Sequence, residues 1–147
     1  MDKNDWVYLA GFIDGEGNVG IDKYNKYGKS TNYAIKVAIS NTNREILEWI
    51  QSHYGGHINT LKRKLPHHKE CYQLTVRHLK AYRILKDIEP YLKIKQKLAC
   101  IAIRVAERCQ VKYNHKSSKP LERQIADEAD YQLVKSLIGR SRLAGRR

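Results

Sequence analysis

Hydrophobic residues near the start of the chain recur at spacings of three and four, which is the period of an amphipathic helix. Leu9, Ala10 and Ile13 follow this spacing. Asp5 precedes them and is a residue type that commonly caps a helix N-terminus. The pattern therefore predicts a helix over residues 6–14, which glycines close soon afterwards.

The next two stretches alternate apolar and polar residues, as a strand with one buried face does. They cover residues 18–26 and 33–40, and a loop rich in turn-forming residues lies between them at 27–32. In the second stretch one face is apolar, with Ile35, Val37 and Ile39, and the other is short, polar or basic, with Ala34, Lys36, Ala38 and Ser40. We expect a hairpin with one buried and one exposed face.

The rest of the chain repeats this order of elements. The pattern predicts a helix over 44–54, strands over 58–62 and 71–76, helices over 79–88 and 93–111, a polar linker over 112–119, a helical stretch over 121–138 and a basic, disordered tail. In the helix over 93–111 the apolar side is formed by Ile94, Leu98, Ile101, Ala102 and Val105. The order indicates an α+β domain with an antiparallel sheet over residues 1–111. Residues 112–147 then form a separate linker, helix and tail.

The net charge of the chain indicates the kind of partner that it binds. The 147 residues include 28 Lys and Arg against 15 Asp and Glu, a formal net charge of +13. A charge of this size and sign points to a polyanion, most often nucleic acid, although a merely solvated basic surface is the alternative.

Cysteine content and hydropathy bear on location. The cysteines, Cys71, Cys100 and Cys109, form no CxxC pair, which favours buried thiols in a reducing intracellular compartment over a disulfide scaffold. The chain has no apolar run as long as a membrane span, and its polar start does not resemble a signal peptide. We therefore expect no membrane partner.

Two carboxylates, Asp14 and Glu16, end the first predicted helix in an otherwise basic chain. Acidic residues at a helix C-terminus oppose the helix dipole, and a bound cation would explain this placement, although an ordinary helix-end charge is the alternative. Mg²⁺ takes oxygen ligands and needs only one or two protein carboxylates. The same helix carries a stripe of Val7, Gly11 and Gly15, along which a second helix could approach closely. Because the motif occurs once, that second helix would come from another copy of the chain across a two-fold axis.

Residues 9–17, Leu-Ala-Gly-Phe-Ile-Asp-Gly-Glu-Gly, resemble the signature nonapeptide of the LAGLIDADG homing endonucleases. The chain differs from that signature by Phe12, Gly15 and Glu16, which are substitutions the family tolerates. Residues 90–97, Pro-Tyr-Leu-Lys-Ile-Lys-Gln-Lys, are similar to a basic segment of its single-motif, homodimeric members. The resemblance covers residues 5–111. It implies an αββαββα fold with a saddle-like antiparallel sheet covered by helices.

The resemblance also implies roles for individual residues. Glu16 and the carbonyl of Gly15 would hold the metal, Mg²⁺, with Mn²⁺ or Ca²⁺ able to occupy the same sites. Lys95 would lie near the scissile phosphate, with a solvated helix face as the alternative. By position, Asn41 and Arg44 match members of a water network, although helix capping explains Asn41 equally well. The dimer interface would comprise Val7, Gly11, Asp14 and Gly15.

Strands with one polar face can lie in a major groove and read base edges. The candidates for DNA contact are Asn18, Asp22, Tyr24, Lys26, Lys29, Asn32, Lys36, Ala38, Ser40, Asn59, Lys62, Arg63, Lys64, Lys69, Gln73, Thr75 and Arg77. A zinc site built from His53, His57, His67 and His68 is disfavoured because no Cys pair accompanies them.

The activity implied by the resemblance is that of an intron-encoded, Mg²⁺-dependent DNA endonuclease. As a homodimer it would make a double-strand break with short 3′ extensions in a long pseudopalindromic site of two related half-sites. The compartment would be an organelle, either chloroplast or mitochondrion, or a prokaryotic cytoplasm. The alternative is an intron maturase that binds intron RNA, or a DNA-binding protein of the same fold that does not cleave.

Overall fold

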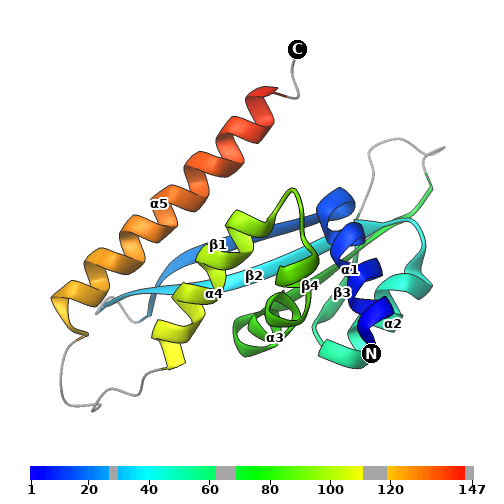
Figure 1. Cartoon of the computed structure of the whole chain (residues 1–147), viewed down its shortest axis with the longest axis horizontal. Helices are drawn as coiled ribbons and strands as arrows, with labels where there is room; N and C mark the ends of the chain where they lie inside the picture. Colours follow the sequence, from blue (N-terminus) through cyan, green and yellow to red (C-terminus); the bar gives the residue numbers. More distant parts are fainter. Residues whose placement is uncertain (27–29, 62–68, 111–118, 145–147) are drawn as a thin grey trace.

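A four-stranded antiparallel sheet with helices on one face forms the molecule (Figure 1). The computed structural model describes residues 1–26, 30–61, 69–110 and 119–144. In chain order the elements are α1 (Lys3–Glu16), β1 (Gly17–Lys26), β2 (Ser30–Asn41), α2 (Arg44–Tyr54), β3 (His57–Leu61), β4 (Cys71–Arg77), α3 (His78–Ile88), the short 3₁₀ helix η1 (Glu89–Tyr91), α4 (Gln96–Gln110) and α5 (Leu121–Ala144). The predicted α+β order is confirmed.

Helix α1 begins earlier than the sequence pattern predicted. Asp2, not Asp5, is its N-cap, and the two residues form a reciprocal capping box. The Asp2 carboxylate accepts the Asp5 N–H at 2.9 Å, and the Asp5 carboxylate accepts the Asp2 N–H at 3.0 Å. The helix also continues to Glu16, because Gly15 remains helical and only Gly17 is extended.

The strand order in the sheet is β1-β2-β4-β3. In the first hairpin the pairing extends to Lys26 opposite Ser30, so β2 begins three residues before the predicted position 33. The two strands therefore stay paired through residues 30–32, which the sequence pattern assigned to a loop. In the second hairpin β3 is displaced by one residue to His57–Leu61, and β4 extends to Arg77.

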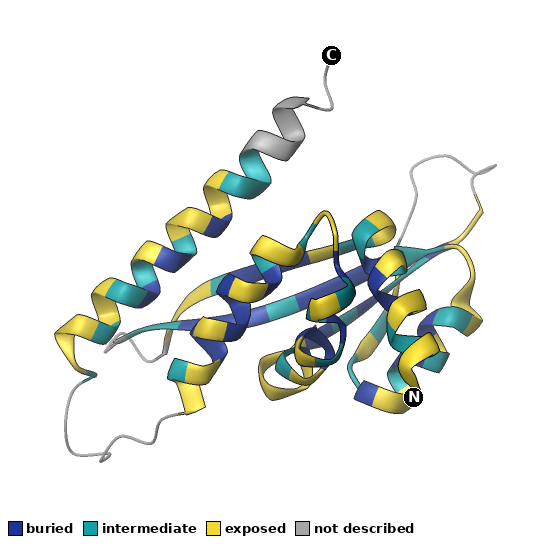
Figure 2. Ribbon diagram, viewed as in Figure 1, coloured by how far each residue is buried: buried dark blue, intermediate teal, exposed yellow. Residues whose placement is uncertain are grey.

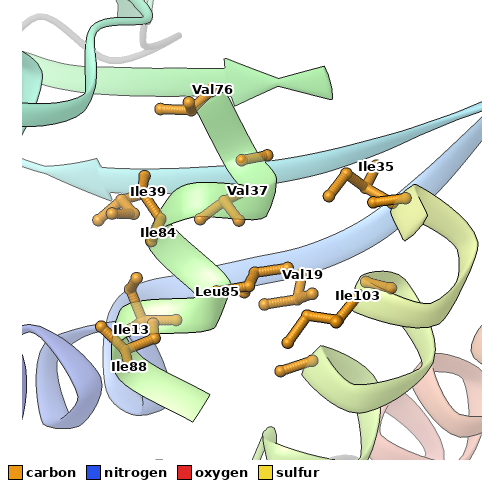
Figure 3. Packing of buried hydrophobic residues seen from close by; sticks show 14 of the residues in the cluster. Ile13, Val19, Ile35, Val37, Ile39, Val76, Ile84, Leu85, Ile88 and Ile103 are labelled. Carbon is orange, nitrogen blue, oxygen red and sulfur yellow. The ribbon is translucent and has the colours of Figure 1, made fainter. Parts of the chain in front are cut away.

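The apolar face of the sheet carries the core. Val19, Val37 and Val76 lie in one row across β1, β2 and β4. Figure 3 shows Ile84 and Leu85 of α3 packed toward this row, and all five residues are buried. Burying each such side chain contributes about 1.5–3 kcal/mol to the free energy of unfolding, which explains why the alternating pattern decides the register.

Helix α4 begins at Gln96, not at residue 93 as predicted. The carbonyl of Lys95 accepts the first helical bond, from the Ala99 N–H at 2.9 Å. Ile94 therefore lies outside the helix and is 77% exposed, which contradicts its predicted place on the buried side. The remaining members of that side are buried or half-buried, with Leu98 half-buried.

Helix α5 is longer than predicted, since it continues beyond residue 138 to Ala144 where a disordered tail was expected. It runs beside α4 and the β1–β2 hairpin, with buried positions on its inner side (Figure 2). Buried Asp127 and Asp130 fasten it to α4 by pairing with Arg108 at 2.8 and 2.5 Å. The predicted linker lies outside the described residues except for Lys119, and the proposed domain division at residue 111 stays a prediction.

The cysteines only partly follow the prediction of buried thiols. Cys71 is buried, whereas Cys100 and Cys109 are exposed on α4. The Cys100 thiol contacts the Glu89 carboxylate at 3.3 Å and the Cys109 thiol contacts the Tyr33 carbonyl at 3.7 Å, while alanine, isoleucine and valine fill the buried side of α4. All three are free thiols. Among the described helices, none has the length and apolar character needed to cross a membrane.

Candidate active site

The last turn of α1 is joined to the segment that precedes α4. The carboxylate of Asp14 accepts hydrogen bonds from the backbone N–H groups of Lys93, Ile94 and Lys95 at 2.7, 3.1 and 2.9 Å. Consecutive N–H groups that converge in this way form a concave anion site. Burial raises the pKa of Asp14, but these three N–H groups outweigh it and hold the pKa below its usual value.

Lys95 is brought to the same turn from the other side. Its ammonium donates a hydrogen bond to the backbone carbonyl of Asp14. Burial lowers the pKa of Lys95, while the negative charges of Asp14 and Glu16 oppose that shift without cancelling it. Glu16 and Lys95, both predicted as site residues, therefore lie close enough for their charges to interact. Their catalytic roles stay predictions.

Glu16 and Gly15 form the exposed tip of α1. No hydrogen bond or ion pair within the described ranges uses the Glu16 carboxylate, so it is available to a ligand. A helix C-terminus also leaves backbone carbonyls without helical partners, and these are hard oxygen donors. The donor set therefore fits a divalent cation such as Mg²⁺.

The described residues of one chain do not form a complete metal site. Across residues 1–26, 30–61, 69–110 and 119–144, no group of three His, Cys, Asp or Glu side chains is placed to hold a metal ion. His53 instead contacts the Trp49 carbonyl at 2.9 Å, and His67 and His68 lie outside the described residues. Further ligands would have to come from water, from DNA or from a second copy of the chain.

The predicted interface stripe of α1 faces solvent. Val7 is 48% exposed, and a Cβ added at Gly11 or Gly15 would meet no atom within 4 Å. These three residues are free to contact a partner. Asp14 differs from them, because its carboxylate already binds residues 93–95 of its own chain. The interface assignment of all four stays a prediction.

Asn41 and Arg44 make other contacts. The Asn41 side chain accepts the Asn43 N–H at 2.8 Å, so it helps to shape the turn before α2. Arg44 pairs with Glu48 at 2.7 Å and lies over the ring of Tyr72. Asn41 does lie at the same end of the sheet as Glu16, because Ile39 pairs with Gly17. Their place in a water network stays a prediction.

The polar face of the sheet gathers most of the candidates for DNA contact. Gly20, Lys36 and Arg77 form one row across β1, β2 and β4, and Asn18, Ala38 and Thr75 form the next. The same face holds Asp22, Tyr24, Asn32, Ser40, Asn59 and Gln73. Lys69 is exposed just before β4, Lys26 is described only in its backbone, and Lys29, Lys62, Arg63 and Lys64 lie outside the described residues.

Sequence reasoning missed two features, one on this face and one beside Lys95. Asp22 pairs with Lys36 at 2.7 Å and with Arg77 at 3.3 Å, which links three strands across the polar face. The alternation of each strand placed these residues on one face, but only the strand order brings them together. A cavity of about 460 Å³ also lies beside Lys95, between Asn18 of β1 and Leu137 of α5.

The family model of LAGLIDADG endonucleases matches residues 9–103. No curated protein sequence matches the chain.

Solved structures show the fold. The homing endonuclease I-CvuI in complex with its target is similar with a TM-score of 0.58 and 18% identity, over 92% of this chain and 95% of that chain. An archaeal intron-encoded homing endonuclease, I-Vdi141I, complexed with DNA, has a TM-score of 0.54 and 15% identity over 93% and 98%. The LAGLIDADG homing endonuclease I-LtrWI bound to target DNA has a TM-score of 0.63 and 18% identity over 90% of this chain but 43% of that chain.

Proposed function

Because the chain belongs to the LAGLIDADG endonuclease family, we propose that it is a homodimeric, intron-encoded homing endonuclease that cleaves double-stranded DNA with a divalent metal. The observation that carries this proposal is the cluster at the end of α1. The exposed carboxylate of Glu16 ends the helical turn on which the partly buried ammonium of Lys95 contacts the Asp14 carbonyl.

The residues of this cluster suit phosphodiester hydrolysis. Glu16 and the Gly15 carbonyl would hold Mg²⁺, and a metal ion bound there would supply Lewis-acid stabilisation and an activated water. The Lys95 ammonium would neutralise charge that develops on the phosphate in the transition state. Asp14 is engaged with backbone amides, so Glu16 is the carboxylate left for the metal.

Double-strand cleavage needs two such clusters. The exposed α1 stripe of Val7, Gly11 and Gly15 would pair with the same stripe of a second copy. An isologous contact of this kind has two-fold symmetry and would bring two Glu16 side chains together. Two sheets would then follow two related half-sites, and the break would leave short 3′ extensions.

The polar face of the sheet would hold the DNA. Its strands carry alternating amide, hydroxyl and basic side chains, which suit base edges in a major groove, and the net charge of +13 suits the phosphates. No helix in the described part of the chain covers this face, so a duplex could approach it (Figure 1).

Cleavage of a plasmid library tests the proposal. The library carries the sequences that flank the intron insertion point, with randomised variants, and cut ends are identified by sequencing in the presence of Mg²⁺. We expect the wild-type protein to cut one site and Glu16→Gln to bind that site without cutting it. Glu122→Gln, the same chemical change at an exposed position on α5, should cut normally. Binding of the site without cleavage by the wild type would favour the non-cleaving alternative.

A further inference from the structure

Asp14 contacts Lys95 at both ends of the lysine. Its carboxylate accepts the Lys95 backbone N–H at 2.9 Å, and its carbonyl accepts the Lys95 ammonium. We propose that Asp14 is a positioning residue that fixes Lys95 beside Glu16 and thereby sets the cleavage rate. The inference rests on the proposed endonuclease function and adds a residue to it.

The segment before α4 depends on Asp14 for its hydrogen bonds. Helices usually begin with a Ser, Thr, Asp or Asn that satisfies free N–H groups, and residues 92–95 are Leu-Lys-Ile-Lys. None of these side chains can accept such a bond. The acceptor comes instead from Asp14, 79 to 81 positions away in the chain. The start of α4 is therefore held at the tip of α1.

This arrangement distinguishes Lys95 from its neighbours. Lys93 and Lys97 are exposed, whereas Lys95 is partly buried with its ammonium on the Asp14 carbonyl. A lysine side chain has many rotamers in solution, and fixing both its backbone and its terminal nitrogen removes most of that freedom. The fixed ammonium stands on the turn that carries Glu16, two residues later.

The contacts explain why an acidic residue is needed at position 14. Both carboxylate oxygens accept hydrogen bonds there, and three donors converge on them. In Asp14→Asn one oxygen becomes an NH₂ group, which is a donor and cannot accept. That change would release part of the 93–95 segment and let the Lys95 ammonium move away from Glu16.

Single-turnover cleavage at saturating enzyme tests the inference. We expect Asp14→Asn to cleave about 10- to 100-fold more slowly, since small misplacements of catalytic groups have effects of this size, with little change in DNA affinity. Asp14→Glu keeps the charge and both acceptors, so it should fold and recover part of the rate. Wild-type cleavage rates in both variants would overturn the inference.

A double-mutant cycle separates positioning from general stability. If Asp14 acts through Lys95, Asp14→Asn should cause no further loss in a Lys95→Met background. Independent, additive losses would contradict this. Tyr54→Phe is the matched control, because it removes a partly buried hydrogen bond of 2.6 Å to Asp87 that also joins distant elements. It should lower thermal stability without altering the cleavage rate.

Amide hydrogen exchange provides a readout that does not need DNA. Asp14→Asn should speed exchange at Lys93, Ile94 and Lys95 and leave the core strands protected, whereas Tyr54→Phe should not affect these three amides. Unchanged protection at 93–95 would overturn the inference even where cleavage falls. If the wild type itself cuts no DNA while these amides are released in Asp14→Asn, the contact is established, but the proposed function is wrong, and the effect of Asp14 on the cleavage rate falls with it.

Discussion

Gly17 follows the last turn of α1 and begins the first strand, and the structure explains why this position has no side chain. A Cβ at this position would lie 2.8 Å from the carbonyl oxygen and 2.9 Å from the Cα of Ile13. These are backbone atoms of the preceding helical turn and cannot rotate away. The close approach of β1 to α1 therefore requires glycine directly after Glu16.

We expect Gly17→Ala to destabilise the protein by about 1–3 kcal/mol, the usual cost of forcing extra volume into a packed site. The shift of the junction should also slow cleavage, because it displaces Glu16. Urea denaturation and single-turnover cleavage measure the two effects. Gly20→Ala is the matched control in the same strand, where a Cβ would meet no atom within 4 Å. Equal stability of the two variants would contradict the expected clash.

At the scale of elements, the carboxylate of Glu128 joins α5 to two strands of the sheet. Glu128 accepts hydrogen bonds from Lys23 of β1 at 2.7 Å and from Gln132 at 2.8 Å, and it also accepts the hydroxyl of Tyr33 from β2. Together the three donors lower the pKa of Glu128 to about 2, and the hydrogen bond from the Lys23 ammonium contributes most to this shift. The docking of α5 should therefore depend on pH.

A carboxylate whose pKa is lower in the folded than in the unfolded chain stabilises the fold above its unfolded pKa, about 4.3. That contribution is lost as the pH falls from there toward 2. Glu128→Gln should therefore melt at a lower temperature than wild type at pH 7, and the difference should shrink steadily below pH 4.5. Thermal melts over this range measure it, with Glu122→Gln on the same helix as the control. A constant difference at all pH values would refute the assignment.

Element types and registers follow from local pattern, whereas several boundaries do not. Alternation predicted that Val19 and Val37 share the buried face, because burial of one face fixes the register. The start of α4 was predicted too early, since it depends on Asp14, which is remote in sequence. The extent of α5 was likewise missed. Its inner side is held by buried pairs such as Arg108 with Asp127, and no local periodicity reports such pairs.

For the whole molecule, the sequence pointed to candidate residues of the site but not to the contacts that join them. The nonapeptide drew attention to Glu16 and the basic segment to Lys95, because both motifs are local, and the roles of both residues stay predictions. The contact of the Lys95 ammonium with the last turn of α1 depends on the tertiary fold, as does the pairing of Asp22 with Lys36 and Arg77. The described residues of one chain do not supply a full set of metal ligands. Whether a second copy of the chain completes the set is therefore the main question about the intact molecule.

The substitution Gly11→Ala tests whether a second copy packs against α1. The added methyl group should stabilise the monomer but weaken the dimer. Within one chain a Cβ at Gly11 would meet no atom within 4 Å, so Gly11→Ala should stabilise α1 by about 0.5–1 kcal/mol through helix propensity. In a dimer that packs α1 against its symmetry mate, the same methyl group would separate the helices. We expect self-association to weaken roughly tenfold, since overpacking of a contact costs at least about 1 kcal/mol, and DNA cleavage to fall with it.

Gly139→Ala is the matched control for this prediction. Gly139 is also a helical glycine at which an added Cβ would meet no atom within 4 Å, but it belongs to α5 and is not part of the α1 stripe. It should give the same gain in stability with normal association and cleavage. Sedimentation velocity across a concentration series, combined with cleavage assays, measures both variants. If Gly11→Ala behaved like Gly139→Ala, the α1 stripe would not be the dimer interface, and the second set of metal ligands would have to reach Glu16 from another surface.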